Sequence, residues 1–272
     1  MDSTSTSMKG SFSPISDLIL GMLGLAGVSF FLAKAFGLPT GFWLITFAFY
    51  LGQSVLILRH WRWQTDFGWA NRATLLRSVL VLALVGWAPF LGDHSSSATS
   101  TELWSYAVIS LIALLLDGVD GKIARATGSH SAFGARFDME LDALFILGLC
   151  VATLALEKAG SWVLALGLMR YLFILACWPL PWLNNPLPDS FRRKTICVWQ
   201  VVTLMVAVVP ITPALFASLT LGLALALLAW SFYLDVRWLY QRRQNHETVI
   251  FSKGKKGQNF FSLVNILSLF LR

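Results

Sequence analysis

The sequence predicts an all-α protein that crosses a membrane about eight times. Of its 272 residues, 56% are hydrophobic and only 13% are charged, and the charged residues form short clusters between long apolar runs. A helix needs roughly 20 mostly apolar residues to cross a bilayer. Because most of the apolar runs approach that length, we expect a polytopic bundle of helices and not a water-soluble domain.

Eight apolar runs are candidates for the membrane-spanning helices. They cover residues 15–37, 41–58, 75–92, 103–118, 138–157, 161–178, 195–211 and 213–236. The first run could be mistaken for a secretory signal, but only one lysine precedes it and the run is long for the apolar part of a signal peptide. We therefore expect a retained helix that follows a disordered polar segment at residues 1–14.

The positions of Lys and Arg predict the orientation of these helices. Alternate loops carry the cations Arg59, Arg62, Arg72 and Arg77, then Lys122, Arg125 and Arg136, then Arg192, Arg193 and Lys194. The opposite loops carry only Lys158, with Lys34 close to one helix end. By the positive-inside rule, the basic loops and both termini are expected in the cytosol. The net charge of +7 then favours contact with anionic lipid headgroups, and no nucleic-acid partner is expected.

Two polar regions flank the helices of the predicted core. Residues 59–74 mix Trp and Arg, as a segment at the membrane interface does, and they link the first two helices to the third. A basic, amphipathic cytoplasmic tail is expected at residues 241–272. Its apolar pattern consists of Phe260, Phe261, Val264, Leu267 and Leu271. This pattern fits either a membrane-surface anchor or a helix docked on the bundle.

Four carboxylates lie at helical spacing between the fourth and fifth runs. Asp117 and Asp120 are three residues apart, and Asp138 and Asp142 are four apart, so each pair lies on one face of its helix. Two helices can therefore direct four carboxylates to one point, and all-oxygen ligands favour Mg²⁺, Mn²⁺ or Ca²⁺. A purely structural Asp–Arg pair is the alternative, but four acids beside one Arg leave a negative charge that cations would neutralise.

Small residues accompany these acids. Gly121, Ala124 and Gly134 remove side-chain bulk, which permits either close helix packing or close approach of a phosphate group to the backbone. Arg125 lies one turn beyond Gly121, where its guanidinium could bind such a phosphate.

The full motif resembles a known family. It reads Asp117, two residues, Asp120-Gly121, two residues, Ala124-Arg125, eight residues, Gly134, three residues, Asp138, three residues, Asp142. All eight fixed positions match the signature of the CDP-alcohol phosphotransferases, also called CDP-alcohol phosphatidyltransferases. The segment from Asn71 to Arg77 is similar to a second family motif, although Ala70 replaces the usual Pro. The chain is nearest to the phosphatidylglycerophosphate synthase-like branch.

The resemblance implies an architecture and a set of roles. A six-helix core would occupy residues 70–240, preceded by two additional helices and their linker at residues 15–69. Two divalent metal ions, Mg²⁺ or Mn²⁺, would be bound by Asp117, Asp120, Asp138 and Asp142, with Asp142 as the general base. The CDP moiety would contact Gly121, Ala124, Arg125 and Gly134. Glu140 falls on another helical face and is not expected to be a ligand.

The implied activity belongs to phospholipid biosynthesis, with transfer of the phosphatidyl group of CDP-diacylglycerol to an alcohol and release of CMP. Arg170 lies inside an apolar run, where a charge is usually functional, although snorkelling to the interface would also explain it. Together with Arg192, Arg193 and Lys194, it would bind the phosphate of an acceptor such as glycerol 3-phosphate. Lys194-Thr195 resembles a Lys-Thr pair of the same branch, whereas Tyr171 replaces an expected Glu. Inositol phosphate, phosphatidylglycerol and serine are alternative acceptors.

A membrane cation transporter is the rival functional class. It would place acids near mid-bilayer in broken helices, whereas these acids lie at a predicted cytoplasmic helix end. We therefore expect an integral enzyme of the bacterial inner membrane with its active site facing the cytoplasm. The two additional helices would pack either against the core or against a homodimer partner.

Overall fold

The computed structural model describes residues 14–60, 69–92, 100–127, 132–188 and 190–253, and within α4 the side chains of residues 119–127 are not described. Eight α-helices and three short 3₁₀ helices (η) form this part of the chain, which contains no strand. They are α1 (Pro14–Phe36), α2 (Thr40–His60), α3 (Trp69–Trp87), η1 (Ala88–Phe90), α4 (Ser100–Thr127), α5 (Ala132–Ala155), η2 (Ser161–Val163), α6 (Leu164–Ala176), η3 (Pro181–Asn184), α7 (Phe191–Val208) and α8 (Ala214–Lys253). The predicted all-α class is confirmed.

Among the described residues, five segments are long and apolar enough to cross a bilayer, which identifies an integral membrane protein. They are Ile15–Phe36, Thr40–Arg59, Asn71–Phe90, Ser100–Gly118 and Ala214–Arg243. Charged residues between Arg136 and Asp142 of α5 and between Arg192 and Lys194 of α7 lie near the starts of these helices, which shortens their apolar parts.

The sixth predicted run forms a helical segment that is short for a membrane span. Its apolar helical segment extends only over Ser161–Ala176, which is shorter than the roughly 20 residues that a spanning helix needs. The Trp178-Pro179 and Leu180-Pro181 steps explain this early end, because a residue before proline is disfavoured in α-helix.

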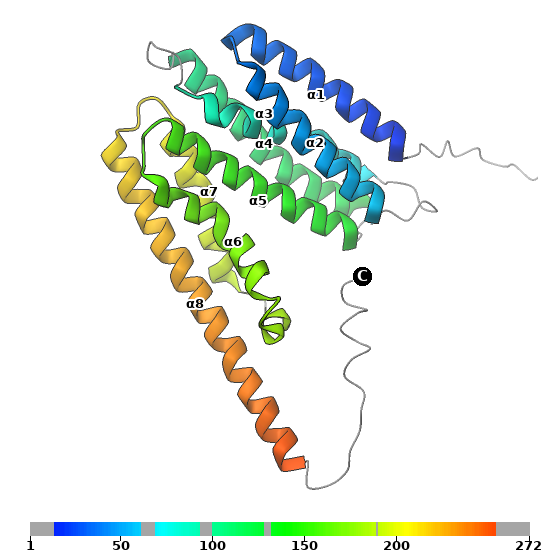
Figure 1. The fold of residues 1–272 in the computed structure, drawn as a ribbon, viewed down its shortest axis with the longest axis vertical. Coiled ribbons are helices and arrows are strands. Elements are labelled where there is room, and N and C mark those ends of the chain that lie inside the picture. Colours follow the sequence, from blue (N-terminus) through cyan, green and yellow to red (C-terminus); the bar gives the residue numbers. More distant parts are fainter. Residues whose placement is uncertain (1–13, 61–68, 93–99, 128–131, 189, 254–272) are drawn as a thin grey trace, which may run out of the picture.

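The helix α3 occupies the centre of the bundle. It contacts α1, α2, α4 and α5 (Figure 1), and 72% of its membrane-spanning window is buried, against 22% for α8. Two glycines allow this close packing. A Cβ atom at Gly86 would lie 1.9 Å from Thr46 Oγ1 of α2, and one at Gly148 of α5 would lie 2.8 Å from Val85 Cγ2. Small residues at these crossings therefore bring α2 and α5 against α3.

The helix α8 extends well beyond the other helices (Figure 1). Its 40 residues correspond to about 60 Å at ~1.5 Å per residue. No Gly or Pro occurs between Gly222 and Gly254, so nothing ends the helix at residue 236, where the apolar run stops. The helix crosses the predicted boundary of the tail at residue 241. The apolar pattern of the tail lies outside the described residues, as do the polar N-terminal residues 1–13.

Candidate active site

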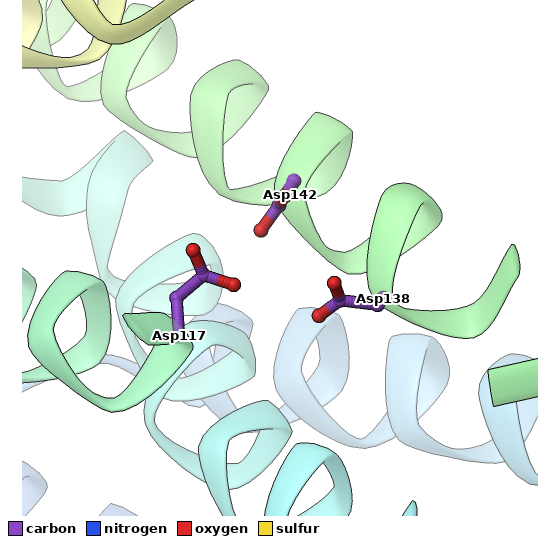
Figure 2. A group of neighbouring side chains, drawn as sticks. All are labelled: Asp117, Asp138 and Asp142. Atoms are coloured by element: carbon purple, nitrogen blue, oxygen red, sulfur yellow. The ribbon is translucent and has the colours of Figure 1, made fainter. Parts of the chain in front are cut away.

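The carboxylates of the motif come from α4 and α5. The helix α4 continues to Thr127, nine residues past its apolar run, and this extension keeps Asp117 in regular helix. Asp138 and Asp142 lie one turn apart near the start of α5. Figure 2 shows all three side chains pointing toward one another, and one carboxylate oxygen from each lies within 4.8 Å of the others. The structure therefore brings together three of the four predicted acids.

A buried arginine from α3 completes this cluster. The Arg77 side chain is 1% exposed and its Nη1 donates a hydrogen bond to Asp117 Oδ1. Its Nη2 donates to Asp142 Oδ1 at 2.8 Å and lies 3.0 Å from Asp138 Oδ1. We call these four residues the acid cluster. The sequence interpretation did not place Arg77 in the site, although a charge within the third apolar run was a usable signal.

The acid cluster fits a metal site. Three carboxylates beside one guanidinium leave two surplus negative charges (three minus one). Asp138 Oδ1 makes an ion-pair contact with Arg77 but accepts no hydrogen bond from the described residues. The three carboxylate side chains are 38–49% exposed, so an ion can reach them. Oxygen ligands of this kind suit Mg²⁺, Mn²⁺ or Ca²⁺.

Other predicted positions lie on the same two helices. Asp120, Gly121, Ala124 and Arg125 belong to the described backbone of α4, but their side chains lie outside the described part of the structure. Gly134 lies in the first turn of α5. The fourth carboxylate and the contacts to CDP therefore remain predictions.

A mainly apolar cavity of about 800 Å³ lies between α5, α6, η3, α7 and α8. Ala143, the residue after Asp142, is part of its lining, so the cavity begins one residue along α5 from the acid cluster, whose own side chains do not line it. Arg170 of α6, Arg193 of α7 and Asp235 of α8 contribute charged groups to it. Its volume lies within the range of roughly 300–1,000 Å³ that is usual for ligand pockets.

The predicted acceptor-binding cations are largely paired with acids. Arg170 Nη2 lies 2.7 Å from Glu140 Oε1, so α5 provides the acid that Tyr171 does not. Asp235 Oδ1 lies 2.5 Å from Arg192 Nη2 and 3.4 Å from Arg193 Nη1.

We call the Arg170–Glu140 pair and the group of Arg192, Arg193 and Asp235 the arginine pairs. Arg193 also donates to the carbonyl oxygen of Pro188. Arg170 and Arg193 line the cavity, whereas Arg192 and Lys194 do not, and Lys194 is exposed. The partners Glu140 and Asp235 were missed from sequence, although an acid in the last long run was again a usable signal.

A comparison with protein-family models agrees with this geometry. The model described as CDP-alcohol phosphatidyltransferase matches residues 67–233, which is more than half of the chain. The chain belongs to the CDP-alcohol phosphatidyltransferase family. Members of this family are transferases of substituted phosphate groups that act in phospholipid synthesis, and their chemistry depends on metal ions. No curated protein and no solved structure matches the chain.

The matched residues of this CDP-alcohol phosphatidyltransferase begin just before α3 and end within α8. They include the acid cluster and the arginine pairs except Asp235, which lies two residues past the end of the match. The helices α1 and α2 lie outside the match. The match is to the whole family and not to its phosphatidylglycerophosphate synthase-like branch.

Proposed function

We propose that this CDP-alcohol phosphatidyltransferase uses CDP-diacylglycerol as the phosphatidyl donor and two divalent cations, Mg²⁺ or Mn²⁺. The cations would be held by Asp117, Asp138 and Asp142 of the acid cluster together with Asp120. The observation that carries this proposal is the surplus of two negative charges where three carboxylates converge. The bound cations would stabilise charge on the diphosphate and on the departing CMP.

In the proposed reaction, the acceptor hydroxyl oxygen attacks the phosphorus next to the lipid, and the bond from that phosphorus to the CMP oxygen breaks. The hydroxyl proton passes to the carboxylate of Asp142. This residue suits the role because its side chain is half-exposed and the next residue along α5, Ala143, lines the cavity. Arg77 holds Asp142 in place by its hydrogen bond, which leaves the second carboxylate oxygen to face the acceptor.

For the donor, we propose that Gly121, Ala124 and Gly134 let the CDP phosphates approach the backbone and that Arg125 binds them. This assignment follows the family motif, residue by residue. The lipid tails of the donor need an apolar surface beside the site, and the apolar lining of the cavity supports such an arrangement.

For the acceptor, we propose glycerol 3-phosphate. Arg170 and Arg193 line the cavity that begins at Ala143, next to Asp142 in α5, and guanidinium groups bind phosphate through charge-assisted hydrogen bonds. Arg192 and Lys194 lie beside Arg193 in α7 and would add positive charge there. Phosphatidylglycerol is a second candidate, because the cavity is mainly apolar and larger than a small polar acceptor requires.

We propose further that the site faces the cytoplasm of a bacterial inner membrane. The orientation is supported by Arg72, Arg136, Arg192 and Arg193, which lie near the predicted cytoplasmic helix ends, whereas Lys158 stands nearly alone in the opposite loops.

Mass spectrometry of the products tests the proposal. The purified protein in lipid nanodiscs would receive CDP-diacylglycerol with glycerol 3-phosphate, inositol phosphate, phosphatidylglycerol or serine, before and after treatment with EDTA. We expect phosphatidylglycerophosphate and CMP, with no CMP release after chelation and recovery on addition of Mg²⁺ or Mn²⁺. Undiminished turnover after exhaustive chelation would reject the metal site, and a preference for serine would reject the phosphorylated acceptor.

A further inference from the structure

The helices α1 and α2 lie outside the family match, yet they pack on the helix that carries Arg77. Each of them contacts α3 far more extensively than it contacts the other (Figure 1). We call these two helices the N-terminal hairpin. Its position beside α3 indicates more than an added membrane anchor, because α3 carries Arg77 of the acid cluster.

Polar contacts join the N-terminal hairpin to α3. Arg72 Nε of α3 donates to Asp17 Oδ2 of α1 at 3.0 Å, and the Asp17 side chain is only 10% exposed. Gln53 Nε2 of α2 donates to Ser78 Oγ of α3 at 3.0 Å, and Ser78 directly follows Arg77. Directional bonds on both sides of Arg77 restrict rotation and sliding of α3.

An apolar contact links the same hairpin to α5. Leu18 of α1, Ile57 of α2 and Leu75 of α3 form one buried cluster, and Phe133 and Phe137 of α5 pack against it. Phe137 directly precedes Asp138. The hairpin therefore packs on the helix that supplies the guanidinium of the acid cluster, and it shares an apolar cluster with the first turns of the helix that supplies two of its carboxylates.

We propose that the N-terminal hairpin is a positioning element of the transferase site and that Asp17 and Ile57 are positioning residues. The inference rests on the proposed metal-dependent function. Like charges from α4 and α5 repel one another, so their convergence depends on helices that are held to within a fraction of an ångström, roughly 0.5 Å. By fixing α3 and the start of α5, the hairpin sets the arrangement into which metal ions bind.

Mn²⁺ binding tests this role without relying on turnover. We expect Asp17→Ala and Ile57→Ala each to weaken Mn²⁺ binding about tenfold, measured by electron paramagnetic resonance on the full chain in nanodiscs, because supporting residues typically contribute 10–100-fold. The kcat should fall by a similar factor while KM for CDP-diacylglycerol changes little. Asp17→Glu should restore part of the affinity, because it can again accept from Arg72.

Two matched variants serve as controls. Leu44→Ala removes an exposed side chain from the same hairpin, and Glu157→Gln neutralises an exposed acid just beyond α5. Both should bind Mn²⁺ as the wild type does. If Asp17→Ala and Ile57→Ala lower the melting temperature but keep wild-type Mn²⁺ affinity and kcat, the hairpin only stabilises the fold and the inference is wrong.

Mn²⁺ binding and CMP release by the wild-type protein distinguish a failure of this inference from a failure of the proposed function. Mn²⁺ binding without CMP release would reject the transferase proposal, while weaker binding in the two variants would still support the hairpin's role. CMP release that is unchanged in both variants would reject the hairpin's role alone. Absence of Mn²⁺ binding by the wild type would overturn both.

Discussion

The acid cluster and the arginine pairs carry opposite surpluses of charge. In the acid cluster, three carboxylates share the guanidinium of Arg77, which leaves a surplus of two negative charges. In the arginine pairs, Arg170, Arg192 and Arg193 meet only the carboxylates of Glu140 and Asp235, which leaves a surplus of one positive charge (three minus two). The first region therefore suits cations and the second, which lines the cavity through Arg170 and Arg193, suits an anionic substrate group.

The two regions also differ in exposure. Arg77 is 1% exposed, whereas Arg170 is 35% and Arg192 and Arg193 are 30% exposed. Breaking a buried charge pair costs about 3–5 kcal/mol, because one charge is left without a partner, whereas exposed pairs contribute roughly 0–1 kcal/mol. The acid cluster is therefore a fixed arrangement, while the exposed Arg170–Glu140 pair can exchange its carboxylate for a phosphate. The carboxylate of Asp235 is only 13% exposed, so its pair with Arg192 and Arg193 is held more firmly.

The largest effect is expected in the acid cluster. Asp117→Ala and Asp138→Ala should each abolish CMP release, since each removes a carboxylate from the predicted metal site and leaves Arg77 less well neutralised. Glu140→Ala should keep most of the activity, because it breaks only the exposed pair with Arg170. Radiometric CMP release measures all three. If Glu140→Ala were as inactive as Asp138→Ala, the acid cluster and the arginine pairs would not differ in their importance for catalysis as we expect.

Asp142→Asn should separate chemistry from binding. The amide can still accept a hydrogen bond from Arg77 but cannot take the acceptor proton. We expect kcat to fall about 10²–10⁴-fold, the usual contribution of a general base. Binding of CDP-diacylglycerol and Mn²⁺, measured by equilibrium methods, should change much less. A loss of Mn²⁺ affinity as large as the loss of rate would make Asp142 chiefly a metal ligand.

The arginine pairs should govern the acceptor. Arg170→Gln and Arg193→Gln should raise KM for glycerol 3-phosphate about 10–100-fold, with KM for CDP-diacylglycerol little changed, because charge-assisted hydrogen bonds contribute roughly 1.5–3 kcal/mol. Steady-state kinetics would compare them with Arg192→Gln, Lys194→Gln and the exposed control Arg237→Gln. Membrane insertion must be checked, since basic residues set topology. Normal acceptor KM in all four site variants would contradict the phosphorylated acceptor.

The smallest effect is expected at Asp235. Asp235→Asn removes the carboxylate that Arg192 and Arg193 share, so both guanidiniums become more available to a phosphate. We expect KM for glycerol 3-phosphate to fall by up to about fivefold, which corresponds to ~1 kcal/mol. A higher KM would show that Asp235 instead orients the two arginines for binding.

Prediction from sequence succeeded where neighbouring residues decide the outcome. The apolar runs located all eight helices, and the spacing of Asp138 and Asp142 placed both on one face of α5. The sixth run ends only two residues before its predicted end but is short for a membrane span, and the prediction was wrong for the end of α8. Two prolines end the sixth run, and the absence of Gly and Pro prolongs α8. The sequence therefore held local signals for both helix ends, but the predicted bounds followed hydropathy instead.

Sequence alone therefore determined the all-α membrane class, the family motif and the elements that carry the acids, because hydropathy and helical spacing are properties of short segments. Tertiary structure decided which charges meet. Arg77 is separated by 40 residues from Asp117 and by 65 from Asp142, and Arg170 by 30 from Glu140. Such contacts depend on how α3, α4, α5 and α6 pack, and close packing at Gly86 and Gly148 is set by facing side chains on other helices.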